Sequence, residues 1–245
     1  MAGRRRAAGT DAPSPDDRGV LRVLAALVHL VVVLVLLAAL IAGAVLFGPV
    51  LVEEFEEGTS PVVFEEPPPA GDREPNQTDS NDPGESTFEA SSGTFTAHDV
   101  EDFVHAAVND RRAEHGADPI EWDGTVASVS RAHSADMNDR EYFDHTNLEG
   151  EDPMDRFRAN ADYCRAYGEN LAMTWADRNV QSDNGEEVDR YETPEELADG
   201  LVEQWMNSPP HREAMLEESW DRGGVGVYLS DDGQVFATHN FCEVP

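Results

Sequence analysis

Tyr-Gly-Glu-Asn-Leu at residues 167–171 lies between Tyr-Phe-Asp-His at 142–145 and Gln-Trp-Met-Asn-Ser-Pro-Pro-His-Arg at 204–212. These three segments decide the fold, because they place a histidine, a glutamate and a second histidine beside glycine, proline or aromatic residues. Polar residues separated by this much sequence form one site only if the fold gathers them. The pattern therefore predicts a single polar cleft in a domain that contains all three segments.

Four helices are predicted around these segments from the spacing of apolar residues and from helix-start signals. They cover residues 96–115, 124–140, 153–157 and 194–208. Gly116 ends the first helix, Thr193-Pro194 starts the last one, and Pro209-Pro210 ends it. The polar, acidic segment at 175–191 is predicted to be a surface loop.

Two strands are predicted at the end of the chain, at 225–229 and 234–241, joined by the turn Asp231-Asp232-Gly233. Helices followed by a terminal hairpin are typical of an α+β fold, in which helices pack on a small antiparallel sheet. Residues 96–245 are enough for one compact domain with its own core.

The three segments resemble the motifs of the CAP superfamily (cysteine-rich secretory proteins, antigen 5 and pathogenesis-related proteins, also called SCP domains) in its prokaryotic form. The resemblance covers residues 100–243 and implies an α-β-α sandwich. It also implies a cleft lined by two histidines and two acidic residues, in which the histidines bind a divalent metal. His145, Glu169 and His211 occupy three of these positions, and Ser208 stands where eukaryotic members have the second acidic residue. A mechanism that requires two carboxylates therefore lacks one of them.

The composition is extremely acidic. Fifty of the 245 residues are acidic, the 17 basic residues are all arginine, and the formal net charge is -33. Such a charge repels nucleic acid and anionic membrane surfaces, so neither is expected as a partner. In molar salt the Debye length falls to about 3 Å and the self-repulsion largely vanishes. The chain is therefore predicted to come from a halophile, and the alternative is an ordinary acidic secreted protein.

Residues 23–52 carry no charged side chain and exceed the ~20 residues that cross a bilayer. Arginines precede this segment and glutamates follow it, which predicts a cytoplasmic N-terminus at 1–22 and an extracellular domain on a single-pass cell-membrane anchor. The alternative is a cleaved signal peptide ending near Ala42-Gly43-Ala44, although the apolar run is longer than the ~7–15 residues typical of such peptides.

Residues 53–95 are rich in Glu, Asp, Pro, Ser and Gly, and are predicted to form a disordered, extended tether. Asn76 begins the sequon Asn76-Gln77-Thr78 and is a candidate glycosylation site on this tether. Cys164 and Cys242 fall on the predicted extracellular side, where an oxidising environment permits a disulfide. Two free thiols are the alternative.

The predicted function is a ligand-binding module. The extracellular domain is expected to bind a small ligand, a lipid or a cell-envelope component in the His-Glu-His cleft, with zinc as a cofactor that the resemblance implies. The alternative is a metal-dependent hydrolase, most plausibly a peptidase. Zinc held by His145 and His211 would then activate a water, with Glu169 as general base or third ligand. A third interpretation gives the domain only an architectural role at the cell surface.

Overall fold

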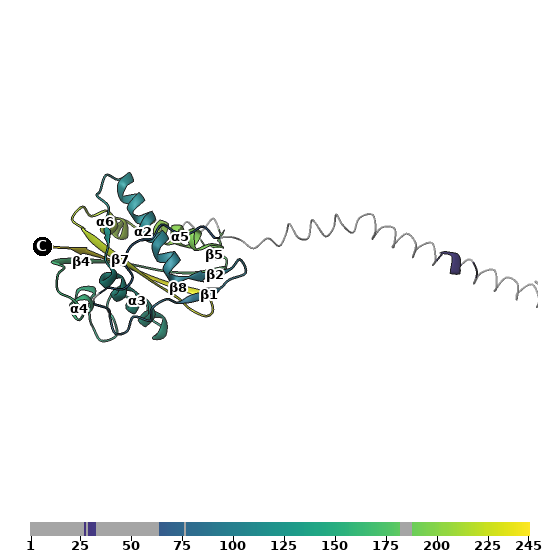
Figure 1. The fold of residues 1–245 in the computed structure, drawn as a ribbon, viewed down its shortest axis with the longest axis horizontal. Helices are drawn as coiled ribbons and strands as arrows, with labels where there is room; N and C mark the ends of the chain where they lie inside the picture. The colour runs from purple at the N-terminus through teal and green to yellow at the C-terminus, as the bar shows by residue number, and fades with distance from the viewer. Residues whose placement is uncertain (1–26, 28, 33–63, 76, 182–187) are drawn as a thin grey trace, which may run out of the picture. The chain divides into compact units, whose positions relative to one another are not determined.

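The computed structural model (Figure 1) describes residues 27, 29–32, 64–75, 77–181 and 188–245. These residues belong to two compact units, 1–60 and 61–245. Of the predicted membrane segment at 23–52, the structure describes only residue 27 and residues 29–32, which are helical. Within the described ranges, no helix combines the length and the apolar content that crossing a bilayer requires.

A four-stranded sheet forms the middle of the second unit, in the order β3-β7-β8-β4. Its strands are β3 (Glu121–Trp122), β7 (Arg222–Leu229), β8 (Gln234–Glu243) and β4 (Ala166–Trp175). β8 is antiparallel to both of its neighbours, whereas the short β3 runs parallel to β7. Two small ribbons lie outside this sheet: β1 (Thr87–Glu89) with β2 (Thr94–Thr96), and β5 (Val180–Gln181) with β6 (Val188–Asp189).

Helices cover both faces of the sheet, as Figure 1 shows. One face carries α3 (Gly124–Asp139) and α4 (Pro153–Arg158), and the other carries α2 (Ala97–Glu114), α5 (Pro194–Asn207) and α6 (Pro209–Leu216). The side chains of β8 alternate between these two layers. Ala237 belongs to the core shared with α2 and α5, whereas Thr238 bonds to Ser134 of α3. The predicted α-β-α sandwich is therefore confirmed.

Capping residues fix where the long helices begin. Thr96, Asp123 and Thr193 each accept a hydrogen bond on the side chain from a backbone N–H of the first helical turn. Gly116 has φ of 80°, a left-handed conformation that glycine adopts without strain, and it follows the end of α2. The starts of these helices were therefore readable from the sequence.

The two sides of the sheet pack by different means. The side under α2 and α5 is apolar and includes the fully buried Trp205. On the α3 side the backbones come very close, since a Cβ on Gly226 would lie 2.0 Å from the backbone nitrogen of Arg131. Ser130 and Ser134 of α3 donate hydrogen bonds to the carbonyls of β7 at 2.9 and 2.8 Å. Small residues on both elements therefore set this spacing.

The predicted tether at 53–95 is folded over the part that the structure describes. Phe64 packs against Phe95 with ring centroids 5.6 Å apart, and Arg73 pairs with Asp102 at 2.5 Å. Aromatic anchors and ion pairs thus hold this polar segment on the domain, which composition alone did not predict. Asn76 and residues 53–63 lie outside the described residues.

Several elements differ from the expectation. The Gly-Glu-Asn motif lies in β4, a long strand that was not predicted because its polar residues mask the apolar alternation. Residues 175–191 include the β5–β6 ribbon as well as loop. A further helix, α6, begins at the proline pair that ends α5, since proline is well accommodated at the first helical position.

The predicted disulfide between Cys164 and Cys242 is confirmed, with an S–S distance of 2.01 Å and a Cα–Cα distance of 5.4 Å. It joins the residues before β4 to the end of β8 and closes a sequence separation of 78 residues. A bridge over a loop of this length stabilises a domain by about 2–5 kcal/mol.

Candidate functional site

Glu169 lies at the centre of the predicted cleft. It projects from β4, and its side chain is only 1% exposed. One carboxylate oxygen accepts a hydrogen bond from His145 Nδ1 at 2.8 Å, and the other accepts one from Arg156 Nη2 at 2.5 Å. Both oxygens of this buried carboxylate are therefore engaged.

Arg156 fixes the loop that carries His145. Asp152 forms a capping box at the start of α4 and so places Arg156 in its short helix. The Arg156 guanidinium then donates from Nη1 to the carbonyl oxygens of His145 at 2.7 Å and Glu151 at 3.2 Å. Sequence reasoning missed this arginine, although the helix start at Asp152-Pro153 was the signal that placed it.

His145 is the exposed member of the cluster, with 49% of its side chain accessible. The hydrogen bond to Glu169 raises the pKa of His145 above its ordinary value, against the opposing effect of partial burial. With Nδ1 donating to Glu169, Nε2 is the ring nitrogen left for a ligand.

His211 lies in the first turn of α6, next to the glutamate motif. Its carbonyl oxygen accepts a hydrogen bond from Asn170 Nδ2 at 2.9 Å, which ties α6 to β4. Burial, together with the nearby charge of His145, lowers the pKa of His211. The fold therefore brings His145, Glu169 and His211 together and moves the pKa values of the two histidines in opposite directions.

His133 of α3 supports the loop from behind. It is 1% exposed, its Nε2 lies 3.0 Å from the carbonyl oxygen of Asp144, and its ring contacts Tyr142. Burial lowers the pKa of His133, which keeps this ring neutral and suited to a structural contact. Ser208, the remaining predicted cleft residue, lies between α5 and α6, and no hydrogen bond to its hydroxyl occurs within the described residues.

Metal binding depends on which atoms remain free. Among the described residues, no group of three or more His, Cys, Asp or Glu side chains is arranged to hold a metal ion. Zinc sites in proteins use three or four such ligands. Each carboxylate oxygen of Glu169 already accepts one hydrogen bond, from His145 or from Arg156, so Glu169 acts first as the support of the His145 ring.

The chain matches the CAP family, described as the cysteine-rich secretory protein family, over residues 105–242. YlbC of Bacillus subtilis (strain 168), named an uncharacterized membrane protein, is 32% identical over 117 residues, which are 47% of this chain and 28% of YlbC. YkwD of the same strain, named an uncharacterized protein, is 30% identical over 146 residues, which are 60% of this chain and 49% of YkwD. The matched region spans less than half of either relative.

Among solved structures, an extracellular protein containing an SCP domain from Bacillus anthracis str. Ames is 27% identical. The match covers 59% of this chain and 40% of that one, with a TM-score of 0.46.

Proposed function

The chain belongs to the cysteine-rich secretory protein (CAP) family, and from this premise we propose that its folded domain is an extracellular binding module. Its ligand site is the cleft formed by His145, Glu169 and His211, and its ligand is a small molecule, a lipid or a component of the cell envelope.

The observation that carries this proposal is that both carboxylate oxygens of Glu169 already accept hydrogen bonds from protein side chains. The donors are His145 and Arg156, so the carboxylate is held in the position of a support that orients a histidine. The groups that remain for a ligand are the two imidazoles. A cleft whose polar groups are positioned in advance in this way suits recognition of a ligand.

The two histidines offer complementary chemistry to a ligand. The raised pKa of His145 favours its protonated form, which is a donor towards an anionic oxygen, whereas the lowered pKa of His211 favours its neutral form, which is an acceptor. Zinc would displace the proton from His145 Nε2 on binding. Glu169 also holds His145 in the way that carboxylates orient metal-binding histidines. Zinc is therefore proposed as an exchangeable ligand of these two rings, and no chemical step is assigned to it.

We place the domain outside the cell, on a membrane anchor formed by residues 23–52. The arginine-before, glutamate-after charge pattern supports this topology, and the disulfide fits an oxidising exterior. The charge of -33 and the absence of lysine support a halophilic source and argue against nucleic acid as a partner.

Zinc titration of the full chain by calorimetry tests the site. We expect weak, saturable binding that falls about tenfold or more in both His145→Ala and His211→Ala. His115→Ala is the matched control, since His115 is an exposed histidine whose ring contacts the Arg111 carbonyl oxygen. Zinc binding that is indifferent to both cleft substitutions contradicts the proposed metal site.

The opposed pKa values of His145 and His211 also favour a second candidate, a hydrolase, because such a pair can divide the roles of acid and base. A peptide-library cleavage assay with and without zinc separates the two functions. Cleavage that disappears in His211→Ala supports the hydrolase. Absence of cleavage beside histidine-dependent binding supports the module.

A further inference from the structure

The outer edge of β4 is open at Met173, whereas just beyond the strand Ala176 is bridged to Tyr191 and Asp177 N donates to Tyr191 O at 2.9 Å. β4 is the last strand in the sheet order, so only one of its edges is bonded to β8. Just after β4, Ala176 N donates a hydrogen bond to Gly233 O at 2.9 Å. Because backbone groups alternate in direction along a strand, the N–H and C=O groups of even-numbered β4 residues point towards β8, and those of odd-numbered residues point outward. Trp205 Nε1 donates to the outward carbonyl of Leu171 at 3.0 Å, in agreement with this phase. The backbone N–H and C=O of Met173 therefore point away from the sheet.

The opposite edge of the sheet is closed where β7 extends beyond β3. Val227 N donates to Glu101 Oε1 at 3.0 Å, and Leu229 N donates to Ser86 Oγ at 2.9 Å. No such side chain caps the backbone of Met173 among the residues that the structure describes. An uncapped strand edge is a template for another extended chain.

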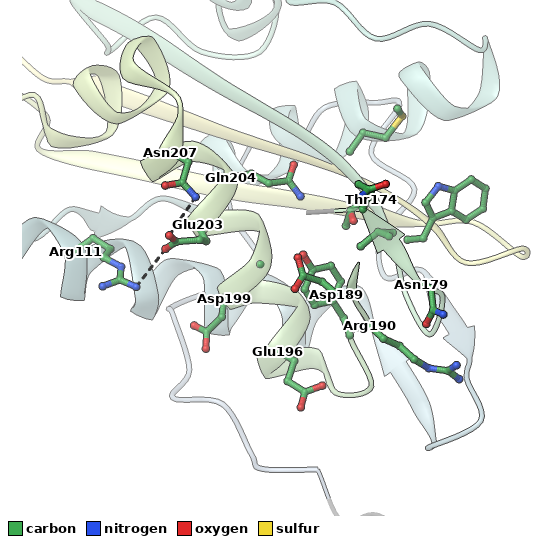
Figure 2. A pocket seen from close by; sticks show the side chains of 16 residues that line it. Arg111, Thr174, Asn179, Asp189, Arg190, Glu196, Asp199, Glu203, Gln204 and Asn207 are labelled. Carbon is green, nitrogen blue, oxygen red and sulfur yellow. Dashed lines mark hydrogen bonds and ion pairs between the residues drawn. The ribbon is translucent and has the colours of Figure 1, made fainter. Parts of the chain in front are cut away.

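A cavity of about 770 Å³ lies beside this edge (Figure 2). Its walls are the end of β4, the β5–β6 ribbon and the exposed side of α5. This volume is in the range of ligand pockets in proteins. Met173 is 42% exposed and lines this cavity together with Thr174 and Trp175.

Among the described residues, the basic residues that line this pocket are all in ion pairs, whereas some of its acidic residues are not. Its two arginines are neutralised, since Arg111 pairs with Glu114 at 3.0 Å and Arg190 pairs with Asp177 at 2.7 Å. Asp189 of β6 and Asp199 of α5 also line the pocket, and neither carboxylate makes an ion pair or side-chain hydrogen bond within the described part of the chain. Figure 2 shows Asp199 between Glu196 and Glu203 on α5. The unpaired charge of the pocket is thus negative.

We propose that this pocket binds an extended peptide with basic side chains, whose main chain pairs with the open position of the β4 edge at Met173. The peptide main chain exchanges hydrogen bonds with Met173, and its arginine or lysine side chains lie against Asp189 and Asp199. Main-chain bonds supply affinity and the pocket supplies specificity in such strand addition. A second copy of this chain is the less favoured occupant, because a net charge of -33 on each copy opposes self-association.

The test is fluorescence anisotropy of the full chain with a labelled, end-capped pentapeptide of alternating valine and arginine. A peptide with glutamate in place of arginine, and one with N-methylated backbone amides, are the comparison probes. We expect the arginine peptide to bind at least tenfold more tightly than either. Equal binding of the glutamate peptide, or of the N-methylated peptide, overturns the proposal irrespective of any protein variant.

Substitutions then locate the site. Met173→Pro removes the outward N–H without touching the bonds to β8, and it is expected to weaken binding about tenfold, whereas Met173→Ala keeps the N–H and the affinity. Asp199→Asn is expected to weaken the arginine peptide about threefold or more. Circular dichroism checks that each variant is folded. Unchanged affinity in a folded Met173→Pro, or a dimer of the free chain that Met173→Pro dissolves, overturns the proposal.

Discussion

Two buried glutamates in this domain are alike in burial and in their arginine partners, and they differ in what else they contact. Glu101 on α2 is fully buried and pairs with Arg73 and Arg131. Glu169 on β4 is 1% exposed and pairs with Arg156. Burial and an arginine partner therefore do not distinguish a structural carboxylate from one in a ligand cleft.

The remaining partner makes the difference. The other oxygen of Glu101 accepts a hydrogen bond from the buried backbone N–H of Val227. Burial raises the pKa of Glu101. The other oxygen of Glu169 accepts a hydrogen bond from His145, whose ring is half exposed. Of these two buried carboxylates, only Glu169 is hydrogen-bonded to a titratable ring that is exposed to solvent. This connection makes the residues around Glu169 a candidate site.

The largest expected effect is the loss of folding stability when Glu101 is replaced. Glu101→Ala removes the acceptor of the Val227 N–H and one of the two carboxylates that pair with Arg131, the other being Asp82. We expect it to lower the free energy of unfolding by about 3–5 kcal/mol. Urea denaturation followed by circular dichroism measures this change. The matched control is Glu149→Ala, which removes an exposed glutamate that pairs with Arg140 and should leave the midpoint unchanged. Equal midpoints for the two variants would show that the Glu101 network is not a structural hub.

Replacing Glu169 is expected to have a smaller effect on stability and to change the pKa of His145. Glu169→Gln keeps the shape but removes the charge that Arg156 and His145 contact, and should cost about 1.5–3 kcal/mol. The loss is smaller than for Glu101 because water can replace the partner of His145. The pKa of His145, followed by NMR, should fall towards 6.5. A variant with the wild-type pKa would contradict the role of Glu169 as the support of this ring.

The sequence predicted one of these two glutamates and missed the other. Glu169 stands in a recognisable motif with Gly168 and Asn170, and the domain followed from that motif and its two companions. Glu101 lies in an amphipathic helix among ordinary acidic residues. Its burial depends on Arg73, which arrives from a segment predicted to be a tether. Long-range ion pairs of this kind leave no local signal in a sequence.

The same limit applies to the support of the cleft. The start of α4 at Asp152-Pro153 was predicted, yet the contact of Arg156 with Glu169 depends on how that helix lies against β4. β4 itself was missed, because Glu169 and Asn170 interrupt the apolar alternation that indicates a strand. Caps, turns and the cysteine pair are local or unique features and were read correctly. Strand pairing and side-chain convergence are properties of the assembled sheet.

The smallest expected effect tests whether the exposed ring couples to folding. The pKa of His145 is raised in the folded state, so the proton that it holds stabilises the fold. This contribution is fully present below the unfolded pKa and is lost as the pH rises through the folded pKa. Because the ring is 49% exposed, we expect a loss of less than about 1 kcal/mol. Urea midpoints measured from pH 6 to pH 9 should therefore fall more for the wild type than for His145→Gln. In the Glu169→Gln background the two slopes should coincide, since the partner that raises the pKa is gone. A difference that persists in that background would assign the pH dependence to a group other than the His145–Glu169 pair.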